Sequence, residues 1–102
     1  MAKKTYATGN NVSAQAYTLY TGKCSYHGFR IGMDGTNDVS LTIADGTGGT
    51  EILPTNTYDA SSLGLNGEVL PDQASITCEI GLVATITCTG TFELVAIYNP
   101  II

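Results

Sequence analysis

The sequence predicts an all-β protein, an antiparallel β-sandwich of jelly-roll type with about eight strands and essentially no helix. Apolar and polar residues alternate along short segments, and turn residues separate these segments at a regular spacing. Nowhere do apolar residues recur at the three- and four-residue intervals of an amphipathic helix. The fifteen threonines concentrate on the outward positions of the segments, as expected of β-branched residues on a pleated surface.

The length of 102 residues is typical of one domain. Residues 1–13 are polar and lack periodicity, so we expect an N-terminal arm there and a single sandwich domain over residues 14–102. Ordering a chain of this size costs on the order of 150 kcal/mol of conformational entropy. Nearly every apolar side chain is therefore needed for one core, and we expect no bound cofactor.

Period-two patterns locate the strands in order along the chain. The predicted strands are Ala14–Tyr20, Ser25–Met33, Val39–Ala44, Glu51–Leu53, Ser62–Leu65, Glu68–Leu70, Ala74–Ile80, Leu82–Thr89 and Thr91–Tyr98. Three of them have a predicted inward or shared face. These faces are Val39, Leu41 and Ile43; His27, Phe29, Ile31 and Met33; and Leu82, Ala84, Ile86 and Cys88.

Turn residues justify the breaks between these strands. Asp34–Asn37 and Asp45–Gly49 combine aspartate, asparagine and glycine, which favour turns. Asn66-Gly67 is a strong tight-turn pair, and Pro54 is expected to end its strand. Gly90 is expected to make the last turn.

The charge balance argues against two classes of partner. Four basic residues stand against nine acidic ones, for a net charge of −5, and from residue 5 onward the balance is −7. Such a chain repels phosphate backbones and anionic lipid surfaces, so we expect neither nucleic acid nor a membrane as a partner. The sequence has no apolar segment of signal-peptide or transmembrane type, and we expect synthesis in a host cytoplasm.

No residue pattern points to catalysis or to a metal. His27 is the only histidine, and a hydrogen-bonded strand histidine is favoured over a general base. The cysteines, which lack metal-ligand spacing, are expected to be free thiols in the core: Cys24, Cys78 and Cys88. Two segments are rich in Asp and Gly, as calcium loops are, but lack the spacing and number of carboxylates that such a loop needs: Asp34–Asp38 and Asp45–Gly49. We interpret both as hairpin turns. We therefore expect no enzyme, although nine carboxylates leave a glycosidase-type pair open.

Five segments carry a resemblance, which covers roughly residues 20–99. They are Gly22–Cys24, Tyr26–Ile31, Val39–Thr47, Gly81–Gly90 and Val95–Asn99. In this order, with one strand ending in an Asp-Gly turn and a Gly-Leu step opening a terminal hairpin, the chain resembles small β-sandwich virion structural proteins of tailed bacteriophages and prophages. The resemblance implies a capsid decoration or cement protein, without catalytic residues, that associates with itself and with the major capsid protein.

This resemblance implies a location on the capsid exterior of the virion, and a homotrimer would suit local three-fold positions. The expected contact residues lie at the two ends of the chain: Lys3, Lys4, Tyr6, Pro100, Ile101 and Ile102. Deleting residues 1–13 is then expected to weaken attachment and leave the fold intact. Two simpler readings stay open, in which the lysines only aid solubility and the terminal isoleucines complete the protein's own core.

The alternative function is a receptor- or carbohydrate-binding domain of a phage tail fibre or baseplate. Six tyrosines could stack on sugars, although half-buried strand tyrosines explain them equally well. A host-side carbohydrate-binding module is a third possibility.

Overall fold

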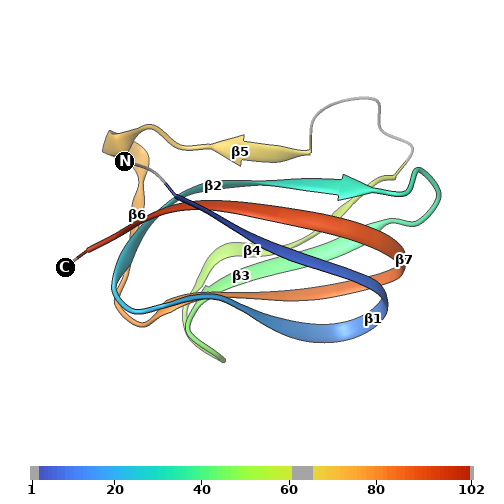
Figure 1. Cartoon of the computed structure of the whole chain (residues 1–102), viewed down its shortest axis with the longest axis horizontal. Coiled ribbons are helices and arrows are strands. Elements are labelled where there is room, and N and C mark those ends of the chain that lie inside the picture. Colours follow the sequence, from blue (N-terminus) through green and yellow to red (C-terminus); the bar gives the residue numbers. More distant parts are fainter. Residues whose placement is uncertain (1–2, 61–65, 102) are drawn as a thin grey trace.

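The structure, a computed structural model, describes residues 3–60 and 66–101. Its elements are β1 (Lys3–Thr21), β2 (Cys24–Met33), β3 (Val39–Asp45), β4 (Glu51–Tyr58), β5 (Gly67–Val69), the 3-10 helix η1 (Asp72–Ala74), β6 (Ile76–Cys78) and β7 (Gly81–Pro100). Every strand pair is antiparallel, and the described residues contain no α-helix (Figure 1). The predicted all-β, antiparallel class is confirmed.

Two long strands, β1 and β7, form a ribbon that folds over on itself. They pair along their whole length, from Lys3 opposite Tyr98 to Thr21 opposite Gly81. Both strands turn back together at one end of the molecule (Figure 1). In β1 the turn contains two register shifts and two residues with left-handed backbone, Asn11 at a φ of 55° and Ala14 at a φ of 47°. The fold-over divides each strand into two halves that lie in different layers.

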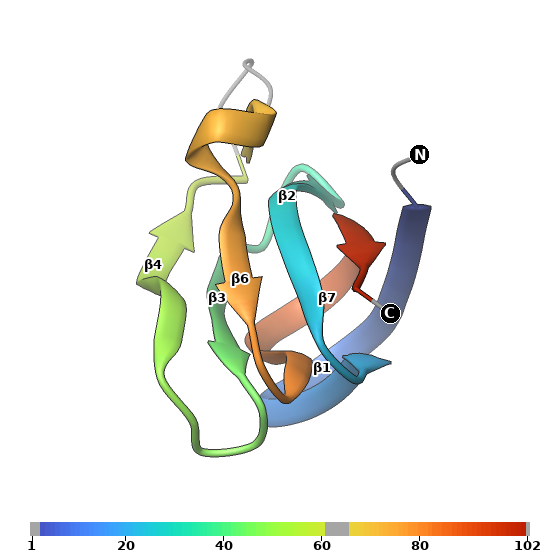
Figure 2. The same cartoon turned by 90° about the vertical axis from the view of Figure 1, so that its left-hand side faces the viewer.

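The two layers share β1 and β7 and otherwise contain different strands. Layer 1 consists of the first half of β1, the second half of β7, β2, β5 and β6. Layer 2 consists of the second half of β1, the first half of β7, β3 and β4. The sheet order β4-β3-β7-β2-β5 therefore curls around one core, as the end-on view shows (Figure 2).

The core lies between the layers. Its strictly alternating positions on β3 and β7 are at most 1% exposed and match the predicted inward faces: Val39, Leu41, Ile43, Leu82, Ala84, Ile86 and Cys88. Three aromatic pairs connect one layer to the other, with ring centroids 4.7 to 5.8 Å apart: Tyr17–Phe92, Tyr20–Tyr98 and Phe29–Tyr58. Edge-to-face and tilted pairs of this kind add to the apolar burial.

The expected N-terminal arm is a strand in the structure. The segment from Lys3 to Asn10 pairs with the second half of β7, and Ala7 is only 6% exposed. Residues 3–13 thus belong to the sheet, which contradicts the boundary at residue 14 and the expectation that deleting the segment spares the fold. The residues of β7 that pair with this segment lie more than 80 positions further along the chain. The segment itself is mostly polar, so its own sequence has no periodicity that would predict a strand.

Two expected strand breaks are absent. β7 continues through Gly90, where a Cβ atom would overlap the side chains of Asp34 and Asn37. The strand is continuous there, but Gly90 lies where β7 folds over from its pairing with β3 to its pairing with β2, and the missing Cβ makes room for those two side chains. β4 continues through Pro54 to Tyr58, because β4 lies at the edge of the sheet, where a missing N–H leaves no ladder bond unmade. The predicted strand Ser62–Leu65 lies outside the described residues, and β6 is shorter than the predicted Ala74–Ile80.

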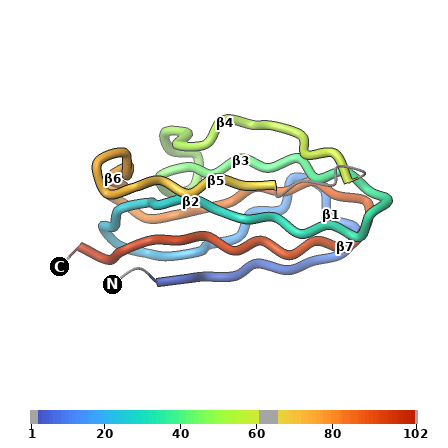
Figure 3. Tube along the Cα trace, turned by 90° about the horizontal axis from the view of Figure 1, so that it is seen from above, coloured from blue at the N-terminus to red at the C-terminus, as the bar shows by residue number. Residues whose placement is uncertain are grey.

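Both described ends of the chain, in β1 and β7, lie at the same end of the molecule (Figure 3). The molecule is elongated, with principal extents of 40, 26 and 19 Å. Both of these ends therefore belong to layer 1.

Candidate functional site

His27 lies on the outer side of β2, opposite to the prediction. The register between β2 and β7 shifts between Tyr26 and Gly28, which marks a β-bulge. The bulge changes the phase of the alternation, so Tyr26 points into the core before it, and Phe29 and Ile31 point into the core after it. The predicted face that joined His27 to Phe29 is therefore wrong, because strict alternation cannot anticipate an extra residue.

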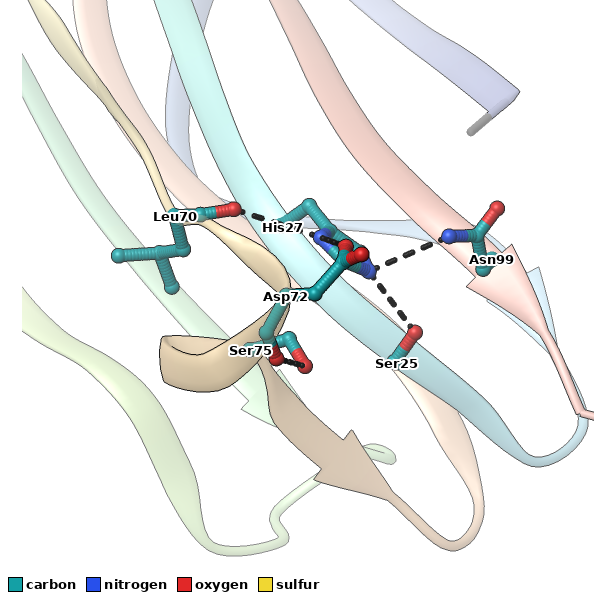
Figure 4. Close-up of polar contacts among 6 residues, drawn as sticks. All are labelled: Ser25, His27, Leu70, Asp72, Ser75 and Asn99. Carbon is teal, nitrogen blue, oxygen red and sulfur yellow. Dashed lines mark hydrogen bonds and ion pairs between the residues drawn. The ribbon is translucent and has the colours of Figure 1, made fainter. Parts of the chain in front are cut away.

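The imidazole of His27 connects β2 to the segment that follows β5 (Figure 4). Its Nε2 atom lies 3.0 Å from Ser25 Oγ and 3.3 Å from Asn99 Nδ2. Its Nδ1 atom lies 3.4 Å from the Leu70 carbonyl oxygen and 3.8 Å from Asp72 Oδ1. An amide nitrogen can only donate, so these contacts assign the ring hydrogen to Nδ1, where it faces Leu70 and Asp72.

A serine, a histidine and an aspartate lie next to one another here, as in a hydrolytic Ser-His-Asp triad: Ser25, His27 and Asp72. Their surroundings indicate a structural role. Nε2 already receives the amide of Asn99, the imidazole is 7% exposed, and the Asp72 carboxylate lies in solvent. The surface pocket beside Phe92 and the one beside Tyr6 are both lined by other residues. A nucleophile needs a base and a substrate site beside it. The geometry here instead holds η1 against β2.

The three cysteines are buried and free, as predicted for core thiols. Cys24 and Cys78 lie directly opposite each other on β2 and β6. Burial raises the pKa of the Cys24 thiol and raises that of Cys78 to about 12. Both thiols are consequently protonated at neutral pH, so they pack as small apolar groups and not as nucleophiles.

The outer side of layer 1 carries an exposed apolar cluster with two cations. The cluster and its cations, which we call the Tyr6 face, are Lys4, Tyr6, Arg30, Val69, Val95 and Ile97. They come from four neighbouring strands and form two cross-strand rows. In one row Lys4, Ile97, Gly28 and Val69 are successive partners; in the next the partners are Tyr6, Val95, Arg30 and Gly67.

Two glycines hollow this face. Gly28 lies between Ile97 and Val69, and Gly67 lies beside Arg30, so each row lacks one side chain. The result is a pocket of about 320 Å³ bounded by the six residues of the Tyr6 face. Tyr6 is 62% exposed and Val69 is 68% exposed. The pocket is therefore a shallow apolar depression with positive charge at its margin.

The structure brings together only part of the predicted contact set. Lys4 and Tyr6 point outward into the Tyr6 face, whereas Lys3 lies on the opposite side of β1, opposite Tyr98. Pro100 is the last residue of β7 and pairs with Cys24, and Ile101 donates its backbone N–H to Lys23, so neither belongs to a free tail. Ile102 lies outside the described residues.

Sequence reasoning missed four residues of this face: Arg30, Val69, Val95 and Ile97. A signal was present, because Leu94–Tyr98 is a continuous apolar run and not an alternating one. Such a run predicts a strand that is covered on both sides. In the structure Leu94, Ala96 and Tyr98 fill the core, while Val95 and Ile97 have no covering layer and are half-buried.

The chain is similar to a solved viral structure. It is the cryo-EM structure of the virus-like particle of extra small virus from the giant freshwater prawn Macrobrachium rosenbergii. The chain is 15% identical to it, all of this chain and 80% of that chain are covered, and the TM-score is 0.37. No family model matches the sequence. No curated protein matches it either.

Two aspartates expected only to form turns also join distant segments. Asp34 accepts backbone N–H groups of Thr36 and Asn37 at 2.8 Å and that of Thr91, on β7, at 3.2 Å. Asp45 accepts the N–H groups of residues 79, 80 and 81 at 2.9, 2.8 and 3.1 Å, which fixes the turn before β7. In the described residues no cluster of acidic, histidine or cysteine side chains could hold a metal ion.

These hydrogen bonds lower the pKa of both carboxyl groups. For Asp34 the side-chain amide of Asn37 is the largest cause, followed by backbone N–H groups. For Asp45 desolvation acts to raise the pKa, but the three N–H groups together outweigh it and lower the pKa. Because the folded pKa lies below the unfolded value of about 3.9, this stabilisation is present above that value and is lost as the pH falls through the folded pKa.

We therefore expect stability to be nearly constant from neutral pH to about pH 5 and to fall below about pH 4. Urea unfolding followed by circular dichroism at successive pH values measures this. Asp45→Asn should lower the unfolding midpoint at neutral pH and reduce its fall in acid. Glu51→Gln, which alters an exposed carboxylate at the start of β4, controls for net charge. Identical acid profiles for Asp45→Asn and the parent protein would contradict this account.

No helix in the described part of the chain is long and apolar enough to cross a membrane.

Proposed function

We propose that this protein is a structural component of a virion, of the decoration or cement type, that attaches to the outer surface of the capsid and associates with itself. The observation that carries the proposal is the Tyr6 face, an apolar, cation-flanked sheet surface left uncovered in the single chain. A cement protein acts through contact surfaces and needs a rigid scaffold behind them. Here that scaffold is a curled sheet with a filled core.

Charge supports the outer surface over the capsid interior. The net charge of −5 opposes contact with packaged DNA, since like charges raise the free energy of approach. The polar groups that could have suggested catalysis have structural partners instead. His27 holds η1 against β2, and Asp34 and Asp45 accept backbone N–H groups from β7 and the turn before it. These features support a non-catalytic role.

The order of motifs along residues 20–99, similar to that of small virion proteins of tailed phages, supports the finer assignment to a phage capsid. In this proposal the partner of the protein is a major capsid protein. The Tyr6 face and the Ile101 end are the surfaces available for contact, because Tyr6 is 62% and Ile101 41% exposed.

Quantitative mass spectrometry of purified particles that carry this gene tests the proposal. A capsid decoration protein is expected in hundreds of copies per particle, and antibody labelling in electron microscopy should follow the head surface. A few copies confined to the tail would instead favour a receptor-binding or baseplate role. Absence from the particles would overturn a virion role altogether.

A further inference from the structure

Cys24 and Cys78 face each other across two neighbouring strands. They are register partners on β2 and β6, which lie side by side (Figure 2), and both side chains are fully buried. Burial is the largest cause that raises the pKa of both thiols, and each thiol further affects the pKa of the other. The two sulfur atoms are therefore close neighbours in the core, and nothing in the proposed function uses them.

The backbone spacing at this pair matches that of a disulfide. Gly22, two residues before Cys24, donates its N–H to the carbonyl oxygen of Ile80, two residues after Cys78, at 2.8 Å. Hydrogen-bonded pairs recur at every second residue of an antiparallel ladder, so Cys24 and Cys78 form such a pair, with Cα atoms about 5.5 Å apart. Disulfides most often join Cα atoms about 5.5–6 Å apart. A bond between the two sulfur atoms can therefore close while β2 and β6 stay paired.

The third cysteine lies at the other end of the molecule. Cys88 pairs with β1 and β3 just before the fold-over of β7 at Gly90. Cys24 lies opposite Pro100, ten residues beyond that fold-over, which is about 30 Å along a strand. Within one folded chain, Cys24 and Cys78 are thus the cysteines that oxidation can join.

We propose that Cys24 and Cys78 form a reversible disulfide when the protein leaves reducing conditions, and that this bond fastens β6 to β2. The bond is not part of the proposed function and does not depend on it, although a virion component meets oxidising conditions on release from the cytoplasm. Side chains of a hydrogen-bonded pair stand further apart than those of a non-hydrogen-bonded pair, so the disulfide is strained. Strained disulfides are readily reduced, which makes this one responsive to redox conditions.

Local opening of β6 gives an oxidant access to the buried pair. β6 has three residues and, in the part of the chain that the structure describes, pairs with β2 alone. Such short elements open at a lower free energy than the core. Asp45 accepts the N–H groups of residues 79, 80 and 81, which holds the turn after Cys78. Cys78 therefore returns to its place opposite Cys24 when β6 closes.

The oxidant is a small-molecule disulfide, for which oxidised glutathione serves as the probe. In the open state the Cys78 thiol loses its proton to solvent and attacks one glutathione sulfur. The S–S bond of glutathione breaks, a bond from Cys78 to glutathione forms, and one glutathione thiolate leaves. Cys24 then loses its proton and attacks the Cys78 sulfur, which releases the second glutathione. The two cysteines lose two electrons and two protons, and one glutathione disulfide becomes two thiols.

Oxidation of the full chain tests the proposal. Reduced protein is incubated with oxidised glutathione at about pH 8, where exposed thiols are partly ionised, and its free thiols are then alkylated. Mass spectrometry should show a loss of two hydrogen atoms and one alkylated cysteine, Cys88. Digestion after lysine, arginine and glutamate separates the cysteines, because Glu79 lies between Cys78 and Cys88. The linked peptides should contain Cys24 and Cys78, and dithiothreitol should separate them.

Stability measures whether the bond fastens the sheet. The disulfide closes a loop of about 55 residues in the unfolded chain. The oxidised protein should therefore unfold in urea at a midpoint higher by about 1 M or more, and dithiothreitol should return the midpoint to that of the reduced protein. Ile76→Ala, which removes half-buried packing atoms from β6, should speed oxidation at least about threefold if β6 opens to admit the oxidant.

Cysteine variants serve as matched controls, and circular dichroism verifies that each keeps its sheet signal. Cys88→Ala should oxidise like the parent and leave no free thiol. Cys78→Ala should form no internal disulfide. An unchanged parent mass, a retained glutathione, a link that includes Cys88, a covalent dimer or equal urea midpoints would each overturn the proposal. None of these outcomes bears on the number of copies in a particle, so the virion role stands or falls by its own experiment.

Discussion

Leu41→Asp is expected to unfold the protein. Leu41 is fully buried at the centre of β3, between Val39 and Ile43 on the face that points into the core. The change removes an apolar side chain, at about 2–5 kcal/mol, and leaves a carboxylate without a partner, at several kcal/mol more. Together these costs approach or exceed the 5–15 kcal/mol by which a small domain is usually stable.

Circular dichroism and urea unfolding measure the effect. The variant should lose the sheet signal and any cooperative transition. Thr42→Asp, one residue along on the outer side of β3, is the matched control and should remain folded, with a loss of about 1 kcal/mol or less. If the two variants behave alike, or if Thr42→Asp is the damaging one, the assignment of the two faces of β3 is wrong.

Gly28→Ala is the second change with a large expected effect. Gly28 has a φ of 123°, which L side chains rarely adopt, and an added Cβ would overlap the backbone carbonyl oxygen of Glu68 on β5. A movement of the bulge or of β5 that made room for the Cβ would break the hydrogen bond of 2.8 Å that Leu70 N–H donates to the His27 carbonyl oxygen. We expect a loss of about 3 kcal/mol or more, together with detachment of β5 from β2.

Hydrogen exchange at the Leu70 amide reports detachment of β5, and urea unfolding reports the overall loss. Gly32→Ala, on the same strand, is the matched control because an added Cβ there would come no closer than 3.7 Å to any neighbouring atom. That variant should be close to neutral. Equal stability of the two alanine variants, with Leu70 protected in both, would contradict the described bulge geometry.

The regular strands were predictable because their chemistry is local. On β3 and on most of the first half of β7, apolar residues that face the core alternate with residues that face outward, and the predicted inward sets were correct. The free, buried state of Cys24, Cys78 and Cys88 followed from the same pattern. Composition and alternation alone were sufficient for the all-β class.

The errors arose wherever a partner distant in sequence decided the local structure. The segment Lys3–Asn10 looks unstructured by itself and becomes a strand by pairing with β7. Gly90 has the residue type of a turn, yet the side chains of Asp34 and Asn37 explain its lack of a Cβ. His27 was placed on the wrong face because a bulge adds a residue that periodicity does not count.

Only part of the candidate site could be predicted from the sequence. Lys4 and Tyr6 were named as residues of an N-terminal arm, and Pro100 and Ile101 were named as contact residues of the C-terminal end. The sheet places Pro100 and Ile101 away from Lys4 and Tyr6. Arg30, Val69, Val95 and Ile97 join Lys4 and Tyr6 because β1, β7, β2 and β5 are adjacent in space. This juxtaposition results from pairing, within layer 1, of strands that are far apart in the sequence.

The sequence by itself determined that this chain forms antiparallel strands and which residues of β3 and of the first half of β7 face the core. These properties depend on residue type and on neighbours one or two positions away. The tertiary structure alone decided that Lys3–Asn10 belongs to the sheet, that His27 lies on its outer side, and that apolar and charged residues from four strands meet on one face. The physical reason is that backbone pairing between distant segments has no signature in either segment alone.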